Sequence, residues 1–260
     1  PERMPAEDTT LTAQWTVNNY TLTFDYGNET VTNETLDFNT TINYPEDVMK
    51  RGYTFNYWEP MPDTMPAHDF TTVAQLSPNN YTVFFDVNEG NGLNDTEEEK
   101  EVTFDSPYGE LPTVDRAGYT FLGWSDSNDT SGEIITEGTI VKTPDDHTLY
   151  AQWKAKTYTV FFDTNGGDPL SEADKAKEVT FDSPYGVLPT VSRTWYVFTG
   201  WYDKRTGGTR VRNDDIVKVA DNHTLYAHWK ENIYTVSFNP NGGSVDPQTM
   251  NVTYNSTYGS

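Results

Sequence analysis

The sequence contains no cysteine among its 260 residues. A chain without cysteine forms no disulfide framework, lacks a thiol nucleophile and offers no thiolate ligand to a metal ion. Basic residues are also scarce, because 17 Lys and Arg stand against 40 Asp and Glu, which gives a net charge of −23. This charge disfavours nucleic acid and anionic membrane surfaces as partners, since both bind basic patches. The sequence also has no apolar run long enough to span a membrane.

Active-site motifs are absent as well. The sequence shows no His–Ser–Asp spacing, no phosphate-binding glycine loop and no zinc motif. Residues 163–168 (DTNGGD) resemble the start of a calcium loop but lack its later ligands. A hairpin turn is the favoured interpretation of this segment, with weak calcium binding as the alternative. We therefore expect a non-enzymatic protein with no catalytic residue, no metal site and no cofactor.

The most informative feature is a long phrase that occurs twice. Residues 101–114 read EVTFDSPYGELPTV, and residues 178–191 repeat the phrase with a single change, at a shift of 77 positions. The segment HTLYAQW at 147–153 likewise returns as HTLYAHW at 223–229. A fixed period of this kind predicts a tandem array of small units rather than one large domain.

The ends of the units are marked by Trp15, Leu76, Trp153 and Trp229. Residues 1–15 match only the end of a unit and residues 230–260 only its beginning, so we expect the parent chain to be longer. The predicted domains are a C-terminal piece of a preceding repeat at 1–15, a short first repeat at 16–76, a second repeat at 77–153, a third repeat at 154–229 and an N-terminal piece of a fourth repeat at 230–260.

Alternating apolar residues predict strands in each unit. Tyr81, Val83 and Phe85 share one face at the two-residue period, as do Leu149, Ala151 and Trp153. The best helix is short, over 171–177, where a capping serine precedes a segment without an apolar stripe. The third repeat carries a dozen aromatic residues, which suffice for a core without disulfides because each buries roughly 150–250 Å².

Four elements recur in a fixed order: YTVFFD at 81–86, YGELP at 108–112, GYTFLGW at 118–124 and LYAQW at 149–153. This pattern resembles the Listeria–Bacteroides repeat, also called the internalin B-repeat family, over essentially the whole chain. The resemblance implies β-grasp-like modules strung along secreted or cell-surface proteins as spacer, stalk or adhesion segments, with no catalytic residues. The sequence departs from the pattern at Trp195, which replaces a glycine, at Tyr57 and at Leu76.

From these observations the expected fold class is β-rich α+β, a tandem array of small β-grasp-like repeat domains that form an elongated rod. Linkers such as 154–157 and 230–232 are too short to let the units tumble freely.

Asparagine-x-Ser/Thr sequons are in excess, with ten present where composition alone gives about four. Such sequons mark surface positions able to carry glycans, although Asn- and Thr-rich turns also generate them by accident. The predicted glycosylation sites are Asn19, Asn28, Asn33, Asn39, Asn80, Asn94, Asn128, Asn222, Asn251 and Asn255.

Two aromatic residues are candidates for ligand binding. Trp195 and Tyr202 have no aromatic counterparts in the second repeat, where Gly118 and Ser125 stand instead. They could stack on a sugar, whereas Trp124 and Trp201 occupy matching positions and are expected in the core.

The expected function is that of an extracellular, N-glycosylated, non-enzymatic repeat protein that acts as a structural stalk, spacer or fibre segment at a cell surface. The alternatives are an adhesin, a carbohydrate-binding repeat and a polymerising fibre subunit. The expected partners are neighbouring repeats, other copies of the chain in a filament, and a surface glycan or protein ligand.

Overall fold

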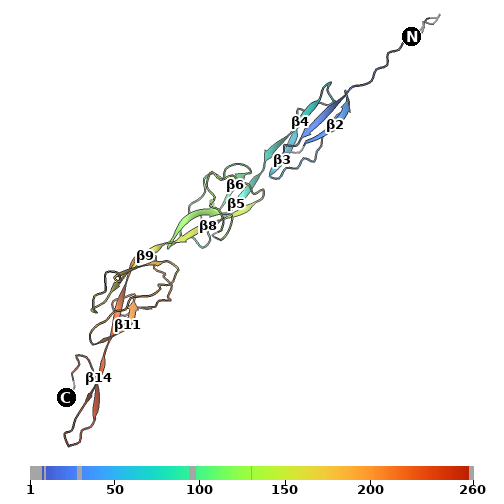
Figure 1. Ribbon diagram of the computed structural model, residues 1–260. Helices are drawn as coiled ribbons and strands as arrows, with labels where there is room; N and C mark the ends of the chain where they lie inside the picture. Colours follow the sequence, from blue (N-terminus) through green and yellow to red (C-terminus); the bar gives the residue numbers. More distant parts are fainter. Residues whose placement is uncertain (1–7, 9, 28–30, 94–97, 130, 258–260) are drawn as a thin grey trace. The chain divides into compact units, whose positions relative to one another are not determined.

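The computed structural model describes residues 8, 10–27, 31–93, 98–129 and 131–257 (Figure 1). Within these residues all regular secondary structure is β-strand. The strands are β1 (Asn19–Asp25), β2 (Val31–Asp37), β3 (Tyr53–Glu59), β4 (Phe70–Pro78), β5 (Asn80–Asp86), β6 (Glu99–Thr103), β7 (Tyr119–Ser125), β8 (His147–Ala155), β9 (Thr157–Asp163), β10 (Ala176–Thr180), β11 (Tyr196–Tyr202), β12 (Arg210–Val211), β13 (His223–Glu231), β14 (Ile233–Ser237) and β15 (Thr249–Thr253).

The expected α+β class is wrong, because no helix occurs in the described part of the chain. At 171–177, where the sequence predicts a helix, the chain makes a turn and then enters β10 at Ala176. Ser171 opens this turn without capping it: its backbone carbonyl accepts the N–H of Asp174 at 3.0 Å, and its hydroxyl donates to the Asp174 carboxylate at 2.6 Å. No helix forms because Ala176 and Lys177 pair with β9 instead. A helix over 171–177 would lose these ladder hydrogen bonds, and the segment has no apolar stripe whose burial would offset the loss.

Two compact units make up the structure. The first contains Pro1–Asp86, Asp95–Pro112 and Ile135–Leu149, and the second contains Val87–Asn94, Thr113–Ile134 and Tyr150–Ser260. In the first unit the first repeat forms a four-stranded sheet of order β2-β1-β4-β3. Its central strands β1 and β4 run parallel, and a hairpin partner flanks each of them in antiparallel orientation.

The loop between β2 and β3 supplies part of this core. Leu22 and Phe24 project from β1 at the two-residue period and meet Trp58 of β3. Ile42 and Val48 of the loop between β2 and β3 pack against the same cluster. The loop can do this without helical structure because burial of apolar side chains is non-directional.

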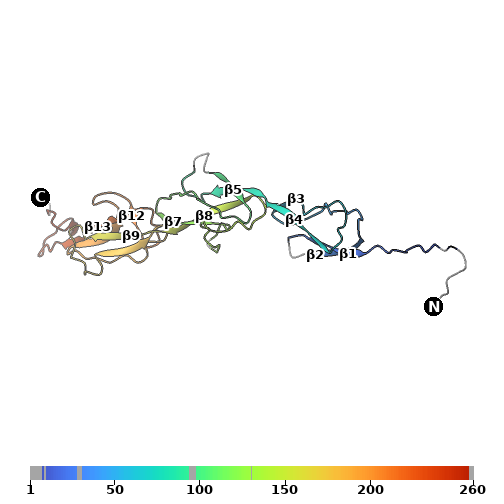
Figure 2. The same ribbon diagram turned by 90° about the horizontal axis from the view of Figure 1, so that it is seen from above.

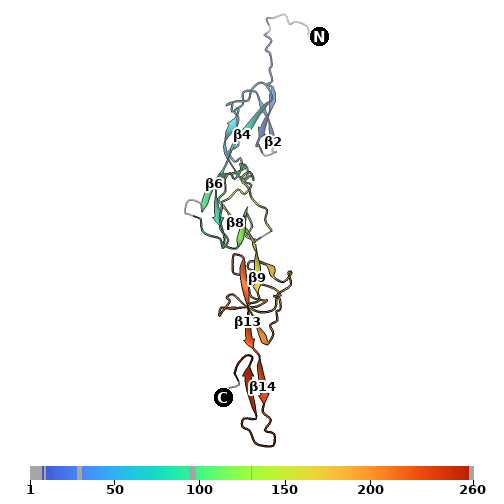
Figure 3. The ribbon, with the colours of Figure 1, turned by 90° about the vertical axis from the view of Figure 1, so that its left-hand side faces the viewer.

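In the second unit the third repeat forms a sheet of order β10-β9-β13-β11-β12, in which β9 and β13 run parallel side by side (Figure 2). Its core cluster includes Val160, Trp201, Val217 and Leu225, all of them at most 2% exposed. The hairpin of β14 and β15 follows this repeat (Figure 3). In the second repeat, β5 pairs with β6 and β7 pairs with β8, both in antiparallel orientation.

Candidate functional site

Single residues connect consecutive repeats. Between β4 and β5 the linker is Asn79, between β8 and β9 it is Lys156, and between β13 and β14 it is Asn232. The backbone N–H of each linker donates to a carbonyl of the preceding repeat, and its carbonyl accepts an N–H of the following repeat. These bonds join Asn79 to Gly52 and Phe104, Lys156 to Gly118 and Phe181, and Asn232 to Trp195 and Tyr254, at 2.9–3.2 Å.

We call each such arrangement a junction clamp. It consists of the linker residue, the residue whose carbonyl the linker binds and the tyrosine that follows that residue in the sequence. It also includes two consecutive residues of the next repeat, an aromatic residue followed by aspartate or asparagine. A linker whose two backbone groups are both bound has little freedom to rotate about its φ and ψ angles. The clamps are therefore the places where backbone hydrogen bonds join the end of one repeat to the start of the next.

The first clamp requires a glycine. Gly52 has φ +81°, a backbone conformation that side chains disfavour. The ring of Phe104 lies against it, and a Cβ at Gly52 would come within 2.5 Å of that ring. Tyr53 packs edge-on against Phe104, with ring centroids 5.6 Å apart. The glycine thus leaves the space into which the next repeat inserts its ring.

A polar contact adjoins the ring. The Tyr53 hydroxyl donates to Asp105 at 2.5 Å, and Lys142 forms an ion pair with the same carboxylate. The hydrogen bond from Lys142, followed by that from Tyr53, lowers the pKa of Asp105. The bond to Asp105 in turn raises the pKa of Tyr53. Both shifts keep the hydroxyl protonated and the carboxylate charged at neutral pH, which is the combination that the bond requires.

The second clamp repeats the first with the same chemistry. Gly118 has φ +82°, and a Cβ there would come within 2.5 Å of Phe181. Tyr119 donates to Asp182, which also pairs with Lys218. A guanidinium lies on the outer face of the tyrosine ring, because Arg116 sits 4.0 Å from the Tyr119 centroid.

The third clamp differs at three positions. Trp195 takes the place of the glycine and keeps the same backbone conformation, at φ +73°. Its indole stacks on Tyr254, with centroids 5.5 Å apart and planes 17° from parallel. Asn255 stands where the other clamps have an aspartate. Trp195 was expected to be a surface residue for ligand binding; the structure places it against the following hairpin, with 48% of the residue still exposed.

Tyr202, the second aromatic candidate, is also engaged. Its ring stacks on the imidazole of His228 at a centroid distance of 3.9 Å, with planes 10° apart. The two candidates lie in different surroundings, since Trp195 contacts the β14–β15 hairpin while Tyr202 packs on a side chain of β13. In the described part of the chain, Trp195 and Tyr202 therefore do not form one aromatic surface for a ligand.

The sequon asparagines that the structure describes are all exposed: Asn19, Asn33, Asn39, Asn80, Asn128, Asn222, Asn251 and Asn255. The remaining two, Asn28 and Asn94, lie outside the described residues. Asn222 also has a structural contact, because its Oδ1 accepts the backbone N–H of Thr159 at 2.8 Å. Asp146 and Asp69 accept the same bond from Thr82 and Thr21 in the other repeats, so an Asx oxygen occupies this position in all three repeats.

The acidic loop at 163–168 uses its carboxylates within the protein. Asp163 pairs with Arg205, and Asp168 accepts the Ser192 hydroxyl at 2.5 Å. Among the described residues, no group of three or more His, Asp or Glu side chains is placed to hold a metal ion. No helix within the described ranges has the length and apolarity needed to cross a membrane.

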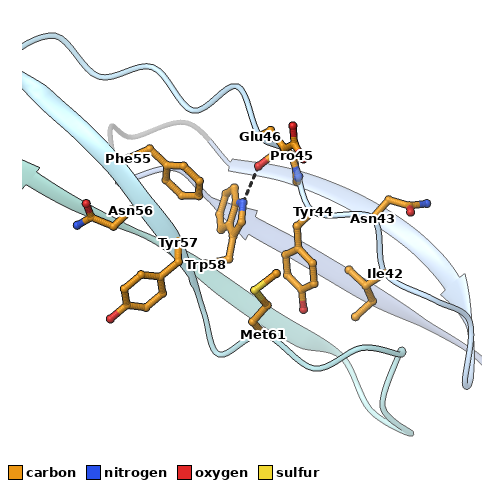
Figure 4. A pocket seen from close by; sticks show the side chains of 10 residues that line it. All are labelled: Ile42, Asn43, Tyr44, Pro45, Glu46, Phe55, Asn56, Tyr57, Trp58 and Met61. Carbon is orange, nitrogen blue, oxygen red and sulfur yellow. Dashed lines mark hydrogen bonds between the residues drawn. The ribbon is translucent and has the colours of Figure 1, made fainter.

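A groove opens on the first repeat beside β3 (Figure 4). Its volume is about 650 Å³, and its floor includes Trp58, whose indole N–H donates to the Pro45 carbonyl at 2.8 Å. Tyr57 and Met61 stand at its rim. The lining residues are Ile42, Asn43, Tyr44, Pro45, Glu46, Phe55, Asn56, Tyr57, Trp58 and Met61.

Sequence reasoning did not identify the clamp residues. A signal was present, because the Phe–Asp pair at 104–105 returns at 181–182 and the Gly–Tyr pair at 52–53 returns at 118–119. The same positions also change together, since Trp195 replaces the glycine in the one clamp where Tyr254 and Asn255 replace Phe and Asp.

Comparison with known proteins agrees with the repeat structure. The family model of the Listeria-Bacteroides repeat domain matches residues 20–77, 81–152, 158–228 and 234–260. A putative Gly-rich membrane protein of Evansella cellulosilytica is 32% identical over 93% of this chain and 29% of its own length. Internalin H of Listeria monocytogenes is 34% identical over 84% of this chain and 36% of its own length.

The chain thus spans about a third of the length of the relatives it matches. The resemblance seen in the sequence is confirmed, and the relative from Evansella cellulosilytica is a putative membrane protein by name. The chain belongs to the Listeria-Bacteroides repeat domain family.

Proposed function

We propose that this chain is a non-enzymatic spacer segment of an extracellular surface protein, in which junction clamps hold consecutive repeats at a fixed distance and angle. The observation that supports the proposal best is the linker of one residue with both backbone groups hydrogen-bonded across the junction. Flexible linkers between domains are longer and rich in Gly and Ser, and they leave their backbone groups to water.

A spacer is useful only if it resists folding back, so each junction has to carry its own stiffness. The first two clamps would supply it through a ring inserted against a glycine and through a Tyr–Asp–Lys contact. The repeats would then form an elongated rod of small modules, each a β-grasp-like sheet whose helix is replaced by a loop. In such an array each unit contacts mainly its neighbours.

The surface chemistry suits exposure outside a cell. A net charge of −23 keeps an extended chain soluble and discourages association with copies of itself. The exposed sequon asparagines would carry glycans that protect the chain from proteases, and Asn222 can do so because its bond to Thr159 uses only Oδ1. Mass spectrometry of the protein from its native source tests this; unmodified asparagines at every sequon would remove glycosylation from the proposal.

Electron microscopy of the purified chain tests the spacer itself. We expect successive repeats in file, with a constant centre-to-centre distance and a narrow range of angles at each junction. Wild-type particles in which the angle between neighbouring repeats is random would contradict the proposal. The adhesin and carbohydrate-binding alternatives predict saturable binding on a glycan or matrix-protein array that Trp195→Ala abolishes, and a blank array removes them.

A further inference from the structure

The first repeat lacks a segment that the other repeats possess. In the third repeat Ile216, which forms the bridge that closes the core loop, lies fifteen positions after Trp201. In the first repeat its counterpart, Thr64, lies only six positions after Trp58. The buried residues after these bridges, Met65 and Val217, occupy matching positions. The omission is therefore confined to the excursion that precedes the bridge.

In the third repeat this excursion covers the edge of the sheet. Arg210 and Val211 form β12, which pairs with Tyr202 and Trp201 of β11. The side chain of Arg210 lies over Gly200, where a Cβ would come within 2.5 Å of its Nε. In the second repeat Ile134 lies in the same way over Gly123. Both longer repeats thus place a side chain over the glycine that precedes the buried tryptophan, and in the third repeat that side chain belongs to a paired strand.

The first repeat leaves this position open. Its β3 is the last strand of the sheet, with no strand on its outer side in the described part of the repeat. Tyr57 stands where the other repeats have the covered glycine and is 53% exposed, and Met61 is 58% exposed. The groove measures about 650 Å³ here, against about 350 Å³ for its counterpart in the third repeat, whose walls include Arg210 and Val211.

The surroundings of the groove are acidic. Glu46 lines it, exposed Glu59 ends β3 beside it, and Asp63 is close enough to Tyr44 to raise the pKa of that tyrosine, after the larger effect of burial. None of the described lining residues is basic. A free strand edge bordered by carboxylates attracts an extended segment with basic side chains, because main-chain bonds hold the strand and charge selects its sequence.

A sugar fits the groove less well. Stacking on a sugar needs exposed aromatic faces, and Tyr57 at the rim offers one, but Trp58 is only 2% exposed and its indole N–H is already bonded to Pro45. An added strand would instead use the edge of β3, and its side chains would enter the groove as Arg210 does in the third repeat.

We propose that the outer edge of β3 and its groove bind an extended segment of a partner protein, in which a basic residue precedes a β-branched one, as an added edge strand. The occupant pairs with Trp58 and Glu59 in the way that Arg210 and Val211 pair with β11. This surface is independent of the junction clamps, so it converts a spacer repeat into a docking repeat without altering the array.

The probe is a fluorescent peptide with the sequence of residues 207–213, GGTRVRN, added to the full 260-residue chain. We expect saturable binding by fluorescence polarisation that weakens as salt rises. A peptide with glutamate in place of both arginines should not bind. Hydrogen exchange at the amides of β3 should slow when the peptide is bound, because strand addition protects them.

Variants of the chain locate the site. Glu59→Lys reverses a charge at the strand edge and should weaken peptide binding at least tenfold. Glu137→Lys changes the net charge equally at an exposed position of the second repeat and should leave the affinity within twofold. Thermal unfolding of each variant shows that the fold is retained.

Absence of peptide binding would overturn the proposal. Equal losses in both variants would overturn it too, because they would reduce binding to nonspecific charge attraction. Binding of neutral oligosaccharides in place of the peptide would assign the groove to sugars and equally overturn it.

Discussion

Replacing Gly118 by alanine should open the second junction. An alanine at φ +82° costs about 1–2 kcal/mol, because the left-handed conformation brings Cβ too close to the following carbonyl oxygen. The added Cβ would also lie 2.5 Å from Phe181, and displacing a packed ring costs about 1–3 kcal/mol. The sum is about 2–5 kcal/mol against the closed junction, which raises its open population at least about thirtyfold.

Trypsin provides the assay because the linker of this junction is Lys156, an exposed residue whose backbone is hydrogen-bonded on both sides. Cleavage after Lys156 requires the linker to leave the clamp, so its rate depends on the open population. We expect Gly118→Ala to accelerate this cleavage at least about thirtyfold, with mass spectrometry used to separate it from cuts at other lysines.

Two controls divide the effect into its causes. Gly207 has φ +65° but nothing within 4 Å of an added Cβ, so Gly207→Ala should lower the unfolding midpoint slightly and leave cleavage after Lys156 unchanged. In a Phe181→Ala background the clash disappears, and Gly118→Ala should then cost only about 1–2 kcal/mol. Equal costs in the two backgrounds, or unaltered cleavage in Gly118→Ala, would refute the reasoning.

Three further predictions concern the polar contacts and the third clamp. The lowered pKa of Asp105 and Asp182 means that these carboxylates stabilise the clamps above their ordinary pKa of 3.8 and lose this effect as pH falls further. The amide chemical shifts of Phe104 and Phe181 should report the opening of the clamps in acid. Asp182→Asn should remove the acid transition of Phe181 alone. The raised pKa of Tyr53 and Tyr119 predicts clamps that hold up to pH 10 and weaken above it. Tyrosinate absorbance should therefore appear at lower pH when Asp105 and Asp182 are replaced by alanine, and an unaltered alkaline titration would argue against the hydrogen bonds. Trp195→Gly should relieve about 1–2 kcal/mol of backbone strain, but it also removes the packing of the indole against Tyr254, which contributes more free energy. Hydrogen exchange in β14 and β15 should therefore become faster. Slower exchange would mean that the strain is the larger of the two effects.

Local periodicity was sufficient to predict strands but not to place the helix. The alternation of Tyr81, Val83 and Phe85 corresponds to β5, since the two-residue period is a property of the strand itself. Ser171 begins a turn, yet the ladder between Ala176 and Phe161 makes the next residues a strand. That ladder depends on the position of β9, about which the residues around Ser171 contain no information.

The clamps were beyond local reasoning for a similar reason. Gly52 and Phe104 belong to different repeats and lie 52 positions apart, so neither residue indicates its partner. Trp195 was correctly recognised as unusual, but the sequence could not show that Tyr254 would cover one face of its ring. The groove was missed because it results from a segment that the first repeat lacks, and its effect is visible only beside the β12 edge of the third repeat.

The central claim is that a junction clamp fixes one repeat against the next, and a distance measurement across the second junction tests it most directly. Because the chain has no cysteine, Thr120→Cys in β7 and Glu178→Cys in β10 provide two exposed, unique positions for spin labels. Pulsed electron–electron double resonance should give one narrow distribution of distances between the two spin labels, and Gly118→Ala should broaden it. A broad distribution in the chain without that substitution would contradict the account.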